Sequence, residues 1–228
     1  MIIHSDKSII AVNKKAGIAV QEGKSGTPSL IKILEPEWGK LFTVHRIDTP
    51  VSGIVLFART KKAAADLSRQ FSSHSLLKRY LAAADSSLPE NEGRLVNNIH
   101  IPSGNKANKV YIKKDSGSNT REASLRYKEI FKTDKYHIFE IILETGRRHQ
   151  IRAQLADAGA HIKGDVKYGA RRTNRGGGIH LHALSLEFNH PDDGKRISLK
   201  AGLPDDSIWN SIPGKLYDSA ADNSDKPN

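Results

Sequence analysis

Several short segments of the sequence combine acidic, basic and aromatic side chains in a way that could support chemistry. The first contains His45, Arg46 and Asp48 and immediately precedes an apolar run at residues 53–58. Catalytic groups often lie on loops that are anchored to a rigid strand, and Pro50 restricts the backbone beside Asp48. An aspartate before a proline-containing turn is also a common turn residue, so this segment taken alone favours a structural role for Asp48.

The second segment is strongly basic and contains Arg147, Arg148, His149 and Arg152. It opens a helix that we expect over residues 147–158, stopped by Gly159 in the left-handed position after the helix. Arg148 and Arg152 are four residues apart, so they would share a face of this helix. Arg152 lies between apolar positions, where a cation needs an anion such as a phosphate or a carboxylate. For Arg147 and Arg148 an ordinary solvated basic face remains open.

Two further segments contribute candidates. Tyr80 lies on a predicted strand at residues 78–84 and is bounded by basic residues; the alternative is a strand tyrosine whose ring packs in the core. Lys163 belongs to a glycine-punctuated loop at residues 161–169, for which a solvated connection is the plain alternative. Other basic residues could clamp phosphates or form a solvated face; they are those from Lys106 to Lys114 and Arg171, Arg172 and Arg175.

The elements that must position these side chains are mainly strands. Short apolar or β-branched runs predict strands at residues 8–12, 53–58, 78–84, 110–112, 123–127, 136–143, 179–188 and 196–201. Helices are expected at residues 30–34, at residues 147–158 and after Thr60, which can cap the helix that follows it. The last two strands form a hairpin. Because strands outnumber helices and do not alternate with them, we expect an α+β fold with a mostly antiparallel mixed sheet, flanking helices and a central cleft.

Domain organisation is simple in this interpretation. The 228 residues fit one catalytic domain, which we place at residues 1–213. The segment 214–228 is dominated by Ser, Asp, Asn and Lys and is expected to be a disordered tail. The stretch from residue 89 to residue 120 is rich in Asn, Lys, Gly and Ser and predicts hairpins and loops.

Composition narrows the class of partner. Lys and Arg outnumber Asp and Glu by 36 to 25, a net charge of +11, which favours a polyanion such as nucleic acid. Cysteine is absent, which excludes a thiol nucleophile, disulfides and a cysteine zinc site. We find neither a signal peptide nor an apolar run long enough to cross a membrane. We therefore expect a soluble, cytoplasmic monomer that needs no metal and no cofactor and binds nucleic acid.

The order of the motifs resembles the RluA-type family of RNA pseudouridine synthases. His45-Arg46-Ile47-Asp48, followed by Ser52-Gly53, is similar to the family's His-Arg-Leu-Asp signature, and Lys78-Arg79-Tyr80-Leu81-Ala82 to its Lys-x-Tyr-x-Ala strand. Residues 145–152, continued by Gly159, Gly164-Asp165 and Tyr168-Gly169, are similar to its long C-terminal motif. The resemblance runs from about residue 9 to residue 203. Among its departures, Val51 stands where the family commonly has a threonine.

The resemblance implies the pseudouridine synthase catalytic fold and a role for each candidate. Asp48 would be the catalytic carboxylate, either as a nucleophile or as the base that takes a ribose proton. Arg152 would hold Asp48 in its charged form, with two-point contact between guanidinium and carboxylate. Tyr80 would stack on the target base and assist proton transfer at C5. The RNA-binding residues would be His45, Arg46, Arg147, Arg148, His149 and Lys163, with Arg46 as a wedge and His45 supporting the loop.

Two other functions remain to be weighed. One is a non-catalytic RNA-binding protein on the same scaffold, although the presence of Asp48, Tyr80 and Arg152 together argues against a retired site. The other is a metal-dependent nuclease that uses His45, Asp48, His149 and His161, although no compact metal-ligand spacing is present. Relatives often carry an N-terminal RNA-binding domain of the S4 type, for which the sequence leaves no room before the first motif. The RNA that is modified, in the ribosome or among tRNAs, cannot be read from the sequence.

Overall fold

The computed structural model describes residues 1–22, 28–102, 109–114 and 119–218. Within these residues the strands form one eleven-stranded sheet. The strands are β1 (Ile2–Ser5), β2 (Ile9–Lys14), β3 (Phe42–Thr43), β4 (Ser52–Ala58), β5 (Leu77–Ala84), β6 (Glu92–His100), β7 (Tyr111–Lys113), β8 (Thr120–Lys132), β9 (His137–Leu143), β10 (Leu181–Asn189) and β11 (Arg196–Lys200). The helices of the described residues are α1 (Leu30–Trp38), α2 (Lys61–Ser72), α3 (Gln150–Asp157), α4 (Ser207–Asn210) and α5 (Gly214–Asp218), together with the 3-10 turn η2 (Val166–Tyr168).

The order of strands across the sheet is β1-β2-β4-β10-β5-β9-β8-β6-β7, with β3 beside β4 and β11 beside β10. Every strand pair is antiparallel except β4 with β10. The expected α+β class with a mostly antiparallel mixed sheet is therefore confirmed. The order also divides the sheet into a first half, made of β1 to β4 with β10 and β11, and a second half, made of β5 to β9.

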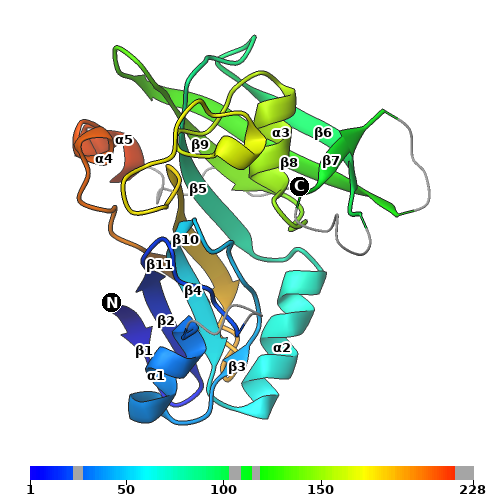
Figure 1. The fold of residues 1–228 in the computed structure, drawn as a ribbon. Coiled ribbons are helices and arrows are strands. Elements are labelled where there is room, and N and C mark those ends of the chain that lie inside the picture. The colour runs from blue at the N-terminus through cyan, green and yellow to red at the C-terminus, as the bar shows by residue number, and fades with distance from the viewer. Residues whose placement is uncertain (23–27, 103–108, 115–118, 219–228) are drawn as a thin grey trace.

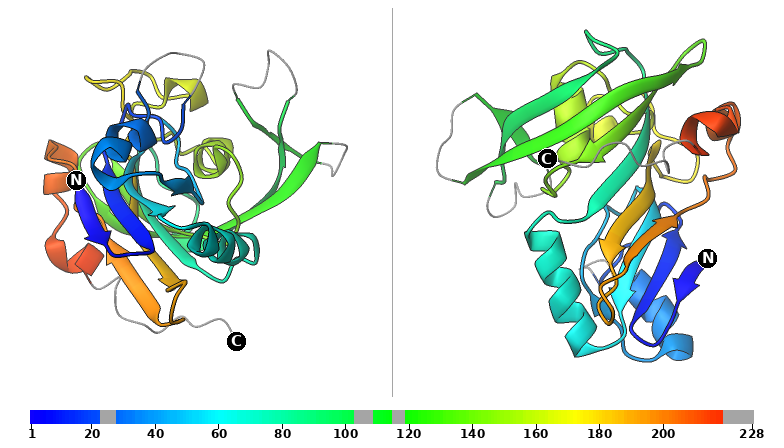
Figure 2. Two further views of the ribbon diagram at one scale, coloured as in Figure 1. Left: turned by 90° about the horizontal axis from the view of Figure 1, so that it is seen from below. Right: turned by 180° about the vertical axis from the view of Figure 1, so that it is seen from behind.

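The two halves are covered by different helices (Figure 1). In the first half α2 packs against β4 and β3, and in the second half α3 packs against β6 and β7. Figure 2 shows the same division from below and from behind, with β5 and β10 running through the middle of the molecule. Any side chain that projects from the β5–β10 junction can therefore meet residues from both halves.

The core begins at two strands that each contain a long apolar run, β2 and β4. All seven residues of β4 and five of the six residues of β2 are buried, as expected for strands that are covered on both faces. Phe57, Leu56 and Ile10 are fully buried at their centre. At roughly 1.5–3 kcal/mol for a fully buried apolar side chain, these strands give the loop that precedes β4 a rigid base.

The single parallel pairing requires a glycine. Gly53 pairs with Ala183 of β10, and its backbone has φ 113, which favours glycine. A Cβ at this position would lie 2.2 Å from the carbonyl oxygen of Ala183. The close approach of β4 and β10 therefore depends on the absence of a side chain at Gly53.

Most predicted elements are present, with shifted ends. Thr60 caps α2 through a hydrogen bond from the Ala63 N–H to its hydroxyl, at 3.1 Å, and Gly159 follows α3 with φ 87. The predicted start of that helix is wrong, because His149 adopts a left-handed conformation (φ 52) and the helix begins only at Gln150. Three strands were not predicted, β1, β3 and β6. β6 is polar and has one buried residue among its nine, so it lacks the apolar alternation of a half-buried strand.

The C-terminal end differs in part from the prediction. The first five residues of the predicted tail form α5, whose first turn is closed by a hydrogen bond from the Leu216 N–H to the Pro213 carbonyl at 2.9 Å. A proline has a fixed φ that suits the start of a helix, so Pro213 favours a helix rather than an extended tail. Residues 219–228 lie outside the described residues, and their disorder stays a prediction.

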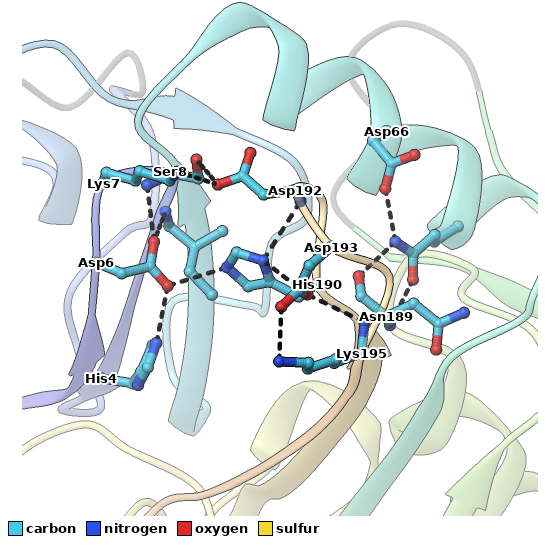
Figure 3. A network of polar contacts seen from close by, with 12 residues as sticks. His4, Asp6, Lys7, Ser8, Asp66, Asn189, His190, Asp192, Asp193 and Lys195 are labelled. Carbon is cyan, nitrogen blue, oxygen red and sulfur yellow. Dashed lines mark hydrogen bonds and ion pairs between the residues drawn. The ribbon is translucent and has the colours of Figure 1, made fainter.

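A polar network joins the turn after β1 to the β10–β11 hairpin (Figure 3). His4 Nε2 and His190 Nε2 each lie 3.0 Å from Asp6 Oδ2. The Ser8 N–H donates to Asp6 Oδ1 at 2.7 Å, and the Ser8 hydroxyl donates to Asp192 at 2.6 Å. Asp6 therefore connects two chain segments that are far apart in the sequence. We call His4, Asp6, Ser8, His190 and Asp192 the Asp6 network.

Candidate active site

A cavity of about 480 Å³ lies between the two halves of the sheet. Its walls come from the loop before β4, the end of α2, the strands β5 and β9, and the beginning of α3. Seven of the nine predicted site residues line it: His45, Arg46, Asp48, Tyr80, Arg147, His149 and Arg152. Arg148 and Lys163 do not. The volume lies in the range of small-molecule sites.

The cavity contains an ion pair between Asp48 and Arg152. Arg152 Nη1 donates to Asp48 Oδ2 at 2.9 Å across 104 positions of sequence. The Arg152 side chain is only 4% exposed, while that of Asp48 is 25% exposed. The carboxylate therefore faces the cavity and the guanidinium lies behind it. The expected contact between these two groups is present.

The two-point contact of Arg152, however, is made with a different carboxylate. Arg152 Nε and Nη2 donate to the two oxygens of Asp165 at 2.7 and 2.8 Å. Asp165 is buried, so both carboxylates share one cation. The expectation of two-point geometry at Asp48 is thus wrong, because Asp165 holds the Nε edge of the guanidinium and leaves only Nη1 for Asp48. Burial lowers the pKa of Arg152, but Asp165 and then Asp48 outweigh it, so that the pKa is raised.

Tyr168 and His149 complete the surroundings of Arg152. The guanidinium carbon of Arg152 lies 4.9 Å from the centre of the Tyr168 ring, a cation–π distance. The Tyr168 hydroxyl lies 2.9 Å from His149 Nδ1 and accepts from the Val110 N–H at 3.0 Å. His149 Nε2 is 3.7 Å from Asp48 Oδ2. Burial lowers the pKa of His149 to about 4, against the opposing charge of Asp48, so at neutral pH this ring is uncharged.

The backbone around Asp48 is fixed by three carbonyl groups in succession. The carbonyl of Asp48 accepts from the Val51 N–H at 3.0 Å, and that of Pro50 accepts from the Ile179 N–H at 3.0 Å. The carbonyl of Thr49 accepts from the Gly17 N–H at 2.8 Å. The turn is therefore held by main-chain bonds, and the buried Val51 side chain packs in the core without a hydroxyl.

Lys14 is a buried residue that supports the backbone next to Asp48, and this role was not predicted from the sequence. Its side chain is fully buried on β2, and its ammonium donates to the carbonyls of Lys15, Ile18 and Thr49 at 3.0, 2.8 and 3.2 Å. Burial lowers its pKa to about 8, against the charge of Asp48. The ammonium thus connects Thr49, next to Asp48, to the segment that follows β2. The one sequence signal was a lysine at the end of a strand that begins with four apolar residues.

His45 and Arg46, which precede Asp48, differ in their surroundings. His45 Nε2 accepts from the Leu56 N–H at 2.8 Å, and its ring stacks on Phe71 with centroids 4.6 Å apart. Burial, with the charge of Lys78, lowers the pKa of His45 to about 3. A neutral ring that is bonded to β4 fits the expected support of the loop. Arg46 is exposed at the rim of the cavity.

Tyr80 projects from the centre of β5 into the cavity. Burial, and then the charge of Asp48, raise its pKa. Within the described part of the chain its hydroxyl makes no hydrogen bond, so the group is available to a ligand. The phenol is therefore uncharged at neutral pH and stands beside the carboxylate.

The remaining basic candidates lie in different places. Arg147 lines the cavity and donates from Nε to the Glu122 carbonyl at 3.0 Å. Arg148 is exposed and precedes α3, so it does not share a helix face with Arg152 as predicted. Lys163 donates to Asn174 at 2.7 Å, away from the cavity lining. Arg171, Arg172 and Arg175 are exposed, and Lys106 lies outside the described residues, so their role as a phosphate clamp stays a prediction.

The histidines considered as metal ligands are engaged elsewhere. His161 Nδ1 lies 3.2 Å from Asp85, and His45 is bonded to β4. Among residues 1–22, 28–102, 109–114 and 119–218, no three His, Asp or Glu side chains group in a way that could hold a metal ion. No helix in the same ranges is both long and apolar enough to cross a membrane.

Comparison with known proteins gives consistent matches. Residues 8–157 match the family model described as RNA pseudouridylate synthase. The chain is 32% identical to tRNA pseudouridine synthase C of Yersinia pestis, with 94% of the chain and 93% of that protein covered. It is 30% identical to ribosomal large subunit pseudouridine synthase D of Zymomonas mobilis, with 90% and 69% covered. The match to tRNA pseudouridine synthase C of Pectobacterium carotovorum is 29% identical and covers 92% of the chain but only 60% of that longer protein.

A solved structure supports the fold. Human RNA Pseudouridylate Synthase Domain Containing 4 superposes with a TM-score of 0.73 at 22% identity, covering 91% of this chain and 90% of that one. At this identity the likeness concerns the fold alone.

Proposed function

The chain belongs to the RluA-type family of RNA pseudouridine synthases, and from this premise we propose that Asp48 is the carboxylate that isomerises a uridine of tRNA or ribosomal RNA. The enzyme is an isomerase. The reaction breaks the bond between ribose C1′ and uracil N1 and joins C1′ to C5 of the same base. The proton on C5 leaves and N1 gains one, so no electron donor or acceptor is required.

The observation that carries this proposal is the position of one charged carboxylate in the cavity. Asp48 faces the cavity, and the charge-assisted hydrogen bond from Arg152 at 2.9 Å fixes its position. Asp165 and Tyr168 keep the guanidinium in place from two other sides. The carboxylate is thus oriented before any ligand enters, which lowers the cost of reaching the transition state.

Two chemical roles fit an ionised carboxylate in this place. Asp48 can attack the nucleoside as a nucleophile, or it can remove a ribose proton as a base. In both, the oxygen that reacts is one that Arg152 does not occupy. Only Asp48 Oδ2 accepts the bond from Nη1, so Oδ1 has no bond to Arg152 and is our candidate for the reacting atom.

Tyr80 is proposed to stack on the target base. Because burial and Asp48 raise its pKa, the phenolate that could accept a proton from C5 is disfavoured. This supports the ring as a stacking surface more strongly than the hydroxyl as a base. Tyr80→Phe keeps the ring, and retained turnover in this variant would remove the proposed proton transfer while leaving the stacking role intact.

The target base must leave its stack to reach Asp48. Extrusion of a base costs roughly a few kcal/mol, and a side chain that fills the vacated space offsets part of this cost. Arg46 is exposed at the rim two residues from Asp48, and we propose it as that wedge. Its guanidinium can stack on the neighbouring bases and meet backbone phosphates.

The class of RNA is proposed from the relatives. Those named above are described as acting on tRNA or on the large ribosomal subunit, and the net charge of +11 suits either polyanion. We retain the expectation of a cytoplasmic monomer, which cell fractionation and size-exclusion chromatography would test.

Pseudouridine mapping tests the function directly. Total tRNA and ribosomal RNA are mapped from cells with and without the gene, and the purified enzyme is then given the unmodified RNA in the presence of a chelator. We expect one or a few sites to disappear with the gene and to return with wild-type enzyme. An enzyme that binds this RNA without forming pseudouridine would overturn the proposal in favour of a binding protein, and inhibition by the chelator would favour a metal enzyme.

A further inference from the structure

The cavity also contains a group of basic side chains that lie away from Asp48, of which Lys78 and Arg147 are cations at neutral pH. Lys78, His74 and Arg147 all line it. Lys78 lies two residues before Tyr80 on β5, so both side chains project from the same face of the strand, about 7 Å apart along it. The cavity therefore has a carboxylate near Tyr80 and a set of cations near Lys78.

Two buried lysines of the protein differ in how their ammonium groups are satisfied. Lys14 donates three hydrogen bonds to carbonyl groups. Lys78 is also buried, but within the described residues its ammonium donates only one bond, to the Thr145 carbonyl at a long 3.4 Å. An ammonium group has three donors. Lys78, which lines the cavity, therefore has donors that no described residue uses.

No carboxylate neutralises this group of cations. In the described ranges neither Lys78, His74 nor Arg147 forms an ion pair with a carboxylate, in contrast to Arg152 with its two. Burial lowers the pKa of Lys78 to about 8, and the charge of Arg147 contributes. Burial, then Lys78 and Arg147, also lower the pKa of His74. His74 is therefore uncharged at neutral pH, whereas Lys78 and Arg147 repel each other, and an anion between them would relieve this repulsion.

The backbone around these three side chains leaves room for such an anion. A Cβ at Gly146 would lie 3.3 Å from Lys78 Nζ, so the missing side chain keeps the space beside the ammonium open. His74 has a left-handed backbone (φ 56) in the turn that leads from α2 into β5, which is uncommon for a residue other than glycine. The turn places its ring at the cavity wall.

We propose that Lys78, together with Arg147 and His74, forms a phosphate subsite that binds a backbone phosphate of the target nucleotide while its base stacks on Tyr80. This inference rests on the proposed function, because it assumes that a uridine enters the cavity. A phosphate suits the site better than a uracil carbonyl does, since a neutral acceptor would leave the repulsion among the cations in place. Lys78 thus acts as a specificity residue for a nucleotide over a free nucleoside.

Small ligands test the subsite without the need for an RNA substrate. Uridine, uridine 5′-monophosphate and uridine 3′-monophosphate are titrated into wild-type protein and followed by NMR. We expect one of the monophosphates to bind roughly tenfold more tightly than uridine, as for one charge-assisted contact. In Lys78→Gln this advantage should fall below about twofold, while Lys78→Arg should retain much of it.

Lys195→Gln is the matched control, because it removes the same charge from an exposed residue in the β10–β11 hairpin, outside the cavity lining. It should leave the advantage of the phosphate unchanged. If Lys78→Gln fails to fold, Arg147→Gln at the edge of the cavity replaces it and should lower the advantage as well. The subsite is refuted if wild type binds uridine and both monophosphates equally, or if the folded variant keeps the full advantage.

Pseudouridine formation separates this inference from the proposed function. If wild type forms pseudouridine but binds the monophosphates no more tightly than uridine, the subsite is refuted and the proposed function stands. A phosphate advantage that depends on Lys78, in a protein that converts none of the mapped RNAs, would sink the proposed function alone. If the proposed function and the phosphate subsite both hold, Lys78→Gln should raise the KM for the RNA substrate more than it lowers kcat.

Discussion

Two aspartates of this protein, Asp48 and Asp6, each accept hydrogen bonds from basic side chains, from an arginine at Asp48 and from histidines at Asp6. Asp48 faces a cavity and meets Arg152, a permanent cation that Asp165 holds from the other side. Asp6 lies in the network that joins the β1 turn to the β10–β11 hairpin and meets His4 and His190 (Figure 3). Asp6 also accepts from the Ser8 and Ile9 N–H groups, so its own oxygens are largely used.

The difference indicates which carboxylate is available for chemistry. A carboxylate whose two oxygens are occupied by four donors stabilises the fold but has little capacity left for a ligand. Asp48 accepts one short hydrogen bond and faces a cavity. Its support lies behind it, in side chains that do not occupy its free oxygen.

The largest expected effect is the loss of activity in Asp48→Asn. Removing the charged carboxylate should lower pseudouridine formation by about a thousandfold or more. Asp6→Asn, the matched change in the other network, should stay within twofold in activity and cost about 1 kcal/mol in unfolding free energy. Single-turnover assays and urea unfolding of both variants measure the contrast. Comparable activity losses in the two would contradict the assignment of Asp48.

Replacement of the cation behind Asp48 should have the second largest effect. Arg152→Lys keeps a positive charge but cannot contact Asp165 at two points and Asp48 at a third. We expect the variant to fold, with turnover lowered about a hundredfold. Circular dichroism confirms the fold before the rate is measured. Near-wild-type turnover would remove Arg152 from the site.

A smaller effect is expected from a change at Asp165, which holds Arg152 in place. Asp165→Asn keeps the shape of the side chain but weakens the two-point contact that orients Arg152. Since the guanidinium then shifts relative to Asp48, kcat should fall about tenfold with little change in KM. An unchanged kcat would show that Arg152 is held by Tyr168 and packing alone.

The smallest effect concerns the acid stability contributed by the Asp6 network. Burial raises the pKa of Asp6, but hydrogen bonds from Ser8, His4, Ile9 and His190 outweigh it and lower the pKa from 3.8 to about 2. A lowered pKa adds stability above the unfolded-state value, and this contribution is lost as pH falls from about 4 towards 2. The difference in unfolding free energy between wild type and Asp6→Asn should therefore shrink over this window. A constant difference would mean that the carboxylate charge does not matter there.

Much of the site could be read from the sequence because its motifs are local. Asp48, Tyr80 and Arg152 stand in short segments whose order resembles one family, and they meet in one cavity. The supports of the site were harder to predict. Lys14 reaches the carbonyl of Thr49, 35 positions away, and such a contact between a side chain and a distant backbone has no signature in local composition.

The errors have physical causes of the same kind. The sequence indicates Asp165 only as part of a motif in an irregular loop and gives it no partner, so its two-point contact with Arg152, 13 positions away, was not predicted. The start of α3 moved from residue 147 to Gln150 because His149 takes a left-handed conformation, which histidine adopts only where tertiary contacts such as that with Tyr168 support it. The strand β6 was not predicted because a polar strand with one buried residue lacks the alternation of apolar and polar residues by which strands are recognised.

The parallel pairing of β4 with β10 determines when the loop that contains Asp48 can be completed during synthesis of the chain. The loop that contains Asp48 is complete only when the Ile179 N–H meets the Pro50 carbonyl and Ala183 settles against Gly53. These contacts join segments about 130 residues apart, so during synthesis they cannot form until β10 has been made. A nascent chain that has emerged only as far as α3 already contains Asp48 and Arg152, yet it lacks the strand on which the catalytic loop rests.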